Sequence, residues 1–244
     1  MPKIESCLTR HCEEGDSGIR VLDSRGKELL RVCQTGWSDH DLTRFVQLTG
    51  SKAPDLFYAT IAGAKLLKVS VYRKQGSRYD RVAEFAGFSV SVVHPDRKPA
   101  VALKPYEYGY GSLTQLYVWD GKSFRRCDDC FPKFYEPEIQ EQWRALNGSE
   151  LPAYVFTDAC QLGATALVYG KKYAEAEELC RKAIHAVDTT TRLVPSVTGG
   201  SPDDLRQEQS AAERRINDVL SAIQNAKRRD ATTDTGLDSP PFVK

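Results

Sequence analysis

The chain has no excess of either charge: 34 lysines and arginines stand against 33 aspartates and glutamates in 244 residues. Such a balance leaves no global attraction for nucleic acid or an anionic membrane, so we expect neither partner. No apolar run approaches the roughly 20 residues that cross a bilayer. No apolar signal-peptide core follows the first methionine. The composition is that of a soluble globular protein with one large domain or two small ones.

Familiar catalytic motifs are also lacking. No serine lies in a G-x-S-x-G turn. The Gly-Lys at 170–171 is followed by Lys172, whereas a phosphate-binding loop continues with serine or threonine. His40 lies between two aspartates, but a polar stretch of this kind is more typical of a solvated turn. We therefore predict a protein that is not an enzyme and needs no cofactor.

The first half of the chain contains a repeat with an offset of 45 residues. Pro54, Tyr72, Gly76 and Arg81 recur as Pro99, Tyr117, Gly121 and Arg126. Around them, β-branched and aromatic segments alternate with glycine-bearing turns, which predicts antiparallel strands. A repeat of this length usually forms one supersecondary unit that stacks on copies of itself. The first copy contains only its second half, so we count about two and a half units.

The order of strands and turns over residues 15–130 resembles the blades of the integrin-type FG-GAP/VCBS β-propeller family, most clearly at Val118-Trp-Asp-Gly-Lys-Ser-Phe124. The resemblance implies a platform of propeller-like blades and an exported or periplasmic protein. The family's calcium loops correspond to 49–55 and 94–99. Each has one carboxylate, too few for the six to eight oxygens of calcium. Two and a half units do not close a ring, so partial propeller-like and sandwich-like packing are both open. A start within a repeat predicts further units upstream.

From about residue 150 the apolar spacing becomes helical, with two amphipathic segments at 153–170 and 173–187. Residues 153–188 resemble a single tetratricopeptide (TPR) helical hairpin, most clearly at 167–184, since Ala164, Ala176 and Ala183 fall at its small positions. Cys180 stands where the family has an aromatic residue. The resemblance implies a groove for a helical or extended peptide, hence a protein or peptide partner.

A last helix is predicted over 202–229, with Pro202 in its first turn. Its apolar residues are spaced as an a/d seam, which favours covering the hairpin, with self-association as the alternative. The predicted packing or partner face consists of Tyr173, Ala176, Ala183, Ile216, Val219 and Ile223. The polar tail from 230 is expected to be disordered.

Seven cysteines include the motif Cys127-Asp-Asp-Cys130. A CxxC pair can be half a zinc site, a redox pair or a local disulfide. A second pair at zinc-knuckle spacing is missing. The two aspartates should raise a thiol pKa, which opposes redox catalysis. A structural role is therefore favoured, although the cysteine count does not decide between a reducing and an oxidising compartment.

Three alternate tyrosines, Tyr106, Tyr108 and Tyr110, occupy the segment 105–111. In an extended segment they would share one side. Together with Trp119 they form a candidate surface for a carbohydrate or peptide ligand. The alternative is that they pack on the sheet.

These observations predict an α+β protein. An antiparallel β-rich repeat domain covers 1–145, a TPR-like helical domain covers 150–229, and a tail covers 230–244. We expect a non-catalytic interaction or scaffold protein that uses its helical surface. A carbohydrate-binding module at the tyrosines and a zinc or thiol protein at the CxxC motif are the alternatives.

Overall fold

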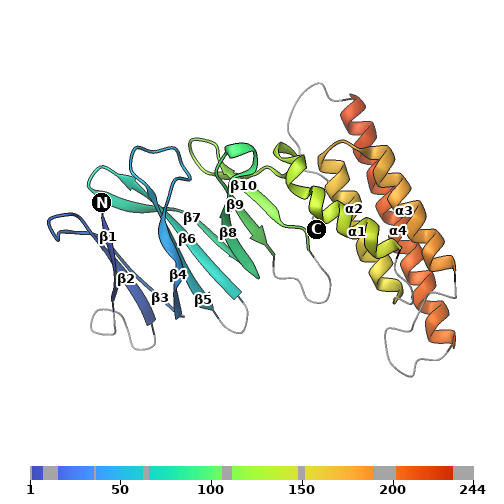
Figure 1. The fold of residues 1–244 in the computed structure, drawn as a ribbon, viewed down its shortest axis with the longest axis horizontal. Helices are drawn as coiled ribbons and strands as arrows, with labels where there is room; N and C mark the ends of the chain where they lie inside the picture. Colours follow the sequence, from blue (N-terminus) through green and yellow to red (C-terminus); the bar gives the residue numbers. More distant parts are fainter. Residues whose placement is uncertain are drawn as a thin grey trace. The chain divides into compact units, whose positions relative to one another are not determined.

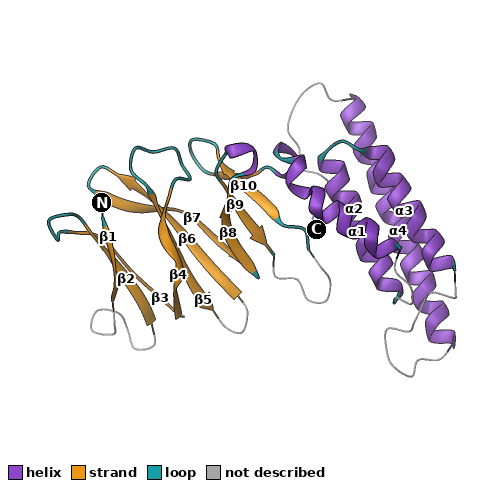
Figure 2. Ribbon diagram, in the orientation of Figure 1, coloured by secondary structure: helices purple, strands orange, loops and turns teal. Residues whose placement is uncertain are grey.

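The structure is a computed structural model, and it describes residues 2–7, 16–35, 37–62, 66–105, 112–147, 152–189 and 202–232. Antiparallel sheets fill the first part and helices the second, so the α+β prediction is confirmed (Figures 1 and 2). The chain divides into two compact units between Cys127 and Asp128. Residues 128–145, grouped with the β-rich domain from the sequence, lie in the helical unit because their helix packs there.

Eleven strands in the described residues form three antiparallel sheets in chain order. The first contains β1 (Lys3–Cys7), β2 (Asp16–Leu22) and β3 (Glu28–Thr35). The second contains β4 (Trp37–Val46), β5 (Asp55–Ala62), β6 (Leu66–Gln75) and β7 (Arg78–Gly87). The third contains β8 (Ser89–Val93), β9 (Ala100–Lys104), β10 (Gln115–Trp119) and β11 (Phe124–Arg126), with a 3₁₀ turn η1 (Pro95–Arg97) after β8.

The sequence repeat coincides with equivalent strands of the second and third sheets. Tyr72 and Tyr117 lie in the third strands of these sheets. Gly76 and Gly121 form the turns that follow, with positive φ angles of 60° and 103°. Glycine is required there because other residues rarely adopt this backbone conformation. Each repeat is therefore one four-stranded sheet.

The second sheet is buried on both faces, since successive residues of a strand point to opposite sides. Leu56 and Tyr58 of β5 join a core with the first sheet. Phe57 and Ala59 of the same strand join a second core with the third sheet. The first core also contains Ile19, Val21, Val32, Tyr72 and Tyr79. The second also contains Leu48, Val69, Val71, Phe85, Val90, Val101 and Leu103. The three sheets are thus stacked layers.

The first sheet has a charged side opposite its core side. Glu5 of β1 lies opposite Arg20 of β2 in the strand register, and Arg20 lies opposite Arg31 of β3. The Arg20 Nε and Nη2 atoms donate to Glu5 Oε2 at 2.9 and 2.7 Å. Arg31 forms an ion pair with Glu28. This side is therefore suited to solvent, whereas Ile19 and Val21 on the other side are buried.

The helical unit begins with two 3₁₀ turns, η2 (Asp128–Cys130) and η3 (Pro132–Tyr135). Its helices are α1 (Glu136–Leu146), α2 (Ala153–Tyr169), α3 (Tyr173–Asp188) and α4 (Pro202–Thr232). Helix α2 packs against the other three helices and is mostly buried. None of the described helices combines the length and apolarity needed to cross a membrane.

Helices α2 and α3 are joined by a disulfide between Cys160 and Cys180, and both residues are fully buried. The two Cα atoms are 5.0 Å apart, so a covalent bond occupies the position where the TPR pattern has an aromatic side chain. A loop of 20 residues closed by a disulfide stabilises a fold by about 3 kcal/mol in the chain-entropy account.

The apolar seam of α4 faces α2 and α3, with Ile216 and Ile223 fully buried. The end of the helix is attached to α3, because the Tyr173 hydroxyl donates to Asp230 Oδ2 at 2.6 Å. Lys171 also pairs with Asp230 at 3.3 Å. Residues 230–232, predicted to belong to the tail, are the last turn of α4, and the rest of the tail lies outside the described residues.

Candidate functional sites

The predicted tyrosine surface can be placed only in part. Tyr106, Tyr108 and Tyr110 lie outside the described residues. Trp119, at the end of β10, is half-buried and meets Phe124 edge to face at 5.3 Å. The guanidinium carbon of Arg73 lies 5.3 Å from the indole centroid, a cation–π contact. Trp119 therefore takes part in contacts between the second and third sheets.

The loop at 49–55 uses its carboxylate internally. Asp55 is fully buried, and its Oδ2 accepts hydrogen bonds from the backbone N–H groups of Leu48 and Thr49 at 3.0 and 2.8 Å. The Thr49 hydroxyl donates to Oδ1 at 2.8 Å. Tyr79 donates to the carbonyl of Pro54, and burial together with the nearby Asp55 carboxylate raises the pKa of Tyr79. Donors from the chain thus surround this carboxylate.

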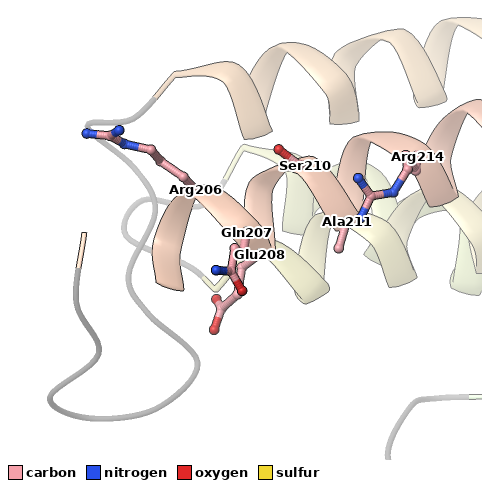
Figure 3. Close-up of a pocket in the computed structure, with 6 residues that line it drawn as sticks. All are labelled: Arg206, Gln207, Glu208, Ser210, Ala211 and Arg214. Carbon is pink, nitrogen blue, oxygen red and sulfur yellow. The ribbon is translucent and has the colours of Figure 1, made fainter. Parts of the chain in front are cut away.

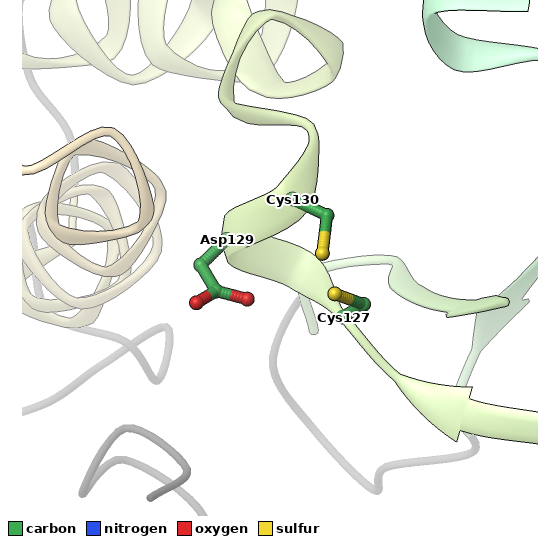
Figure 4. A group of neighbouring side chains, drawn as sticks. All are labelled: Cys127, Asp129 and Cys130. Atoms are coloured by element: carbon green, nitrogen blue, oxygen red, sulfur yellow. The ribbon is translucent and has the colours of Figure 1, made fainter. Parts of the chain in front are cut away.

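Cys127 and Cys130 are both disulfide-bonded, and Figure 4 shows their sulfur atoms facing each other. The two sulfurs and a carboxylate oxygen of Asp129 lie within 4.8 Å of one another. Cys130 and Asp129 are exposed, and Cys127 is half-buried. Asp128 is instead buried and accepts a hydrogen bond from the Tyr135 hydroxyl at 2.9 Å. In this oxidised state, the geometry favours a structural disulfide over a zinc site or a redox pair.

The predicted helical packing or partner face lies largely inside the unit. Five of its residues, Ala176, Ala183, Ile216, Val219 and Ile223, are buried. Tyr173 is half-buried and holds Asp230. The apolar seam of α4 thus packs on the hairpin of α2 and α3, which is the alternative that the sequence favoured over self-association. A partner could therefore contact α2 only on the side of this helix that the other helices leave exposed.

That open side is a narrow stripe formed by Tyr154, Asp158 and Gln161, spaced so that they share one helix face. The Tyr154 side chain is 38% exposed, and Gln161 is also exposed. Asp158 is half-buried, and within the described part of the chain its carboxyl makes no hydrogen bond or ion pair. Burial raises the pKa of Asp158 to about 6, against the opposing influence of Arg215 on α4. Asp158 was not among the predicted site residues, although a lone carboxylate in an apolar helix is a visible signal in the sequence.

A shallow open depression of about 560 Å³ lies beside the first turns of α4. Its described lining comes from this helix alone: Arg206, Gln207, Glu208, Ser210, Ala211 and Arg214. Figure 3 shows the polar side chains spread along the helix surface rather than converging on one point. The depression is therefore a weaker candidate than the α2 stripe.

Asparagine in place of Asp158 is expected to stabilise the protein at neutral pH but not in acid. Because the folded-state pKa is about 6 against 3.8 for the free group, folding disfavours the charged carboxylate. The cost is absent well below pH 4, where both states are protonated; it develops as pH rises from about 4 to about 6 and is complete above that range. After allowance for solvent screening, we expect a gain of about 1 kcal/mol at pH 8.

Urea unfolding of the variant at pH 4, 6 and 8 measures this effect, with Asp218→Asn, an exposed change on α4, as the matched control. A gain in stability of Asp158→Asn that is the same at pH 4 and pH 8 would show that the carboxyl is not destabilised by burial.

Comparisons with known proteins add no family to this picture. No protein-family model, curated protein or solved structure matches the chain. The resemblances to FG-GAP/VCBS blades and to a TPR hairpin therefore stay predictions from sequence patterns.

Proposed function

We propose that this protein is a non-catalytic interaction or scaffold protein whose TPR-like helical unit binds a protein or peptide segment. The segment would lie along the stripe of Tyr154, Asp158 and Gln161 on α2 and place a lysine or arginine against Asp158. The observation that carries the proposal is the half-buried Asp158 carboxyl, which makes no hydrogen bond or ion pair with the described residues and is influenced only partly by Arg215. The stacked sheets would serve as a rigid platform.

The energetics of Asp158 favour a cationic partner. A carboxylate that loses water without gaining a hydrogen bond costs free energy, and the influence of Arg215 offsets this cost only in part at Asp158. A basic side chain from a partner would supply a hydrogen bond and a close positive charge. Because the binding partner would also remove water from this ion pair, the pair would be stronger than one on an open surface. Tyr154 beside it offers a large exposed aromatic surface, a type enriched among residues that dominate binding energy.

We further propose that the protein works in an oxidising compartment, as an exported or periplasmic protein would. Disulfides persist in such compartments and are rare in the cytosol. The support comes from five cysteines in the disulfide-bonded state, of which two form the buried Cys160–Cys180 bridge.

Selection of a random peptide library on the full chain tests the proposed function. The selected peptides should share a lysine or arginine, and their affinity should fall at least about tenfold in Asp158→Asn and in Tyr154→Ala. Binding should also weaken as pH falls through about 6, because Asp158 then becomes neutral. Asp218→Asn serves as the control that should change nothing. Selected peptides without a basic residue, or binding that Asp158→Asn leaves unchanged, would refute the site.

A further inference from the structure

We propose that the motif Cys127-Asp-Asp-Cys130, once reduced, binds one Zn²⁺ ion through the two thiolates and the Asp129 carboxylate. This inference is independent of the proposed peptide site, because it concerns a different surface and a different chemistry. In the oxidised protein the same sulfurs are disulfide-bonded and are not available as ligands. The motif would thus have two states, a covalent bond when oxidised and a metal site when reduced.

The backbone already brings the three ligand atoms together. Cys127 directly precedes the 3₁₀ turn η2 and Cys130 ends it, so the two residues are three positions apart, and such residues lie above one another in a 3₁₀ turn. Tetrahedral zinc with Zn–S bonds of about 2.3 Å holds two sulfurs about 3.8 Å apart. The two sulfurs and the Asp129 oxygen lie within 4.8 Å of one another. Small side-chain rotations therefore suffice to reach zinc geometry.

The two aspartates of the motif have different roles. Asp128 is buried and bonded to the Tyr135 hydroxyl, so it stabilises the turn. Asp129 is exposed beside Cys130, and in the view of Figure 4 its carboxylate lies across the ribbon from the two sulfur atoms, so its side chain would rotate toward them to bind the same ion. Two thiolates and one carboxylate leave a fourth position for water on the open side, as in three-ligand zinc sites. The bound cation lowers the pKa of the thiols, and this effect outweighs the rise in thiol pKa caused by the negative carboxylates.

The reduction step is balanced by an external dithiol. Two thiols of the reductant become a disulfide, and two electrons and two protons pass to the sulfurs of Cys127 and Cys130. Attack requires access to a sulfur atom, and Cys130 is exposed. Cys160 and Cys180 are fully buried in the helical hairpin, so this bridge should survive the same treatment. Cys33 is also disulfide-bonded and exposed, and it therefore needs its own control.

The test uses the full folded chain, reduced with dithiothreitol and transferred without oxygen to reductant-free buffer. Alkylation and mass spectrometry establish which thiols are free. Zn²⁺ is then titrated in competition with a chromophoric chelator. We expect one Zn²⁺ per reduced chain and none bound by the oxidised chain. Free thiols at Cys127 and Cys130 without zinc binding would overturn the proposal.

Variants identify the ligands. Cys127→Ser and Cys130→Ser should each lower the affinity by about 100-fold, and the exposed change Asp129→Asn by about 10-fold. Cys33→Ser and Asp120→Asn are the controls and should retain full affinity. With Co²⁺ in place of Zn²⁺, thiolate-to-metal absorption should occur in the Cys33→Ser variant and be lost in Cys130→Ser. Binding that survives Cys127→Ser and Cys130→Ser would place the metal elsewhere and refute the site.

Discussion

Alanine in place of Asp55 is expected to lower the free energy of unfolding of the β-rich unit by about 4 kcal/mol. The carboxylate accepts three hydrogen bonds in a fully buried loop, two from the backbone N–H groups of Leu48 and Thr49 and one from a hydroxyl. Alanine would leave all three donors buried and unsatisfied. Each such group costs about 1–3 kcal/mol, and hydrogen bonds to a charged acceptor are at the strong end.

Urea unfolding followed by circular dichroism at pH 7 measures the loss. Asp55→Asn keeps the shape but turns an amide NH₂ group toward donors, so an intermediate loss of about 2 kcal/mol is expected. Asp80→Ala is the matched control, since Asp80 is partly exposed and forms an ion pair with the exposed Arg78. Its loss should stay below about 1 kcal/mol. An Asp55→Ala protein as stable as the Asp80→Ala protein would show that the loop does not depend on its carboxylate.

The second large effect is expected for Gly87→Ala, at the end of β7 where the chain passes into the third sheet. A Cβ atom at this position would lie 2.5 Å from the carbonyl oxygen of Lys104 and 2.6 Å from Leu103 Cδ1. The oxygen cannot move freely, because it accepts the Phe88 N–H at 2.8 Å. Loss of that hydrogen bond and displacement of β9 should cost about 3 kcal/mol.

An opposing effect is smaller. Alanine restricts the unfolded chain more than glycine does, which alone would stabilise the protein by about 0.4–1 kcal/mol. The steric conflict with backbone atoms should therefore dominate. Ser89→Ala, two residues further on and exposed, is the control, with an expected change below about 0.5 kcal/mol. Chemical denaturation of both variants measures these changes. Unchanged or increased stability of Gly87→Ala would contradict the close approach of Gly87 to the Lys104 carbonyl oxygen.

The sequence was most informative where a local pattern determines structure. The offset between Tyr72 and Tyr117 and the glycines at 76 and 121 was sufficient to predict equivalent hairpins. The packing of the sheets was left open between propeller-like and sandwich-like arrangements, and the structure shows that the second sheet has apolar residues on both faces. Helix periodicity located α2, α3 and α4 to within a few residues.

Features that depend on contacts between distant residues could not be predicted. Asp55 resembled a remnant of a metal loop, and only the fold brings the N–H groups of Leu48 and Thr49 to it. The Cys160–Cys180 bridge depends on the register of two packed helices, which periodicity does not define. The packing of helix α1 on α2, which groups it with the helical unit, is likewise a tertiary contact that periodicity does not define.

The middle sheet has a consequence for the cooperativity of the β-rich unit. In a linear array, the free energy of opening one element is its own stability plus the interfaces it shares with its neighbours. Strands β4 to β7 share two apolar interfaces, whereas β1 to β3 have one, with Glu5 and Arg20 on their other side. The first sheet can therefore detach while the other two remain folded. The middle sheet has no such partial state, since its loss removes both interfaces at once.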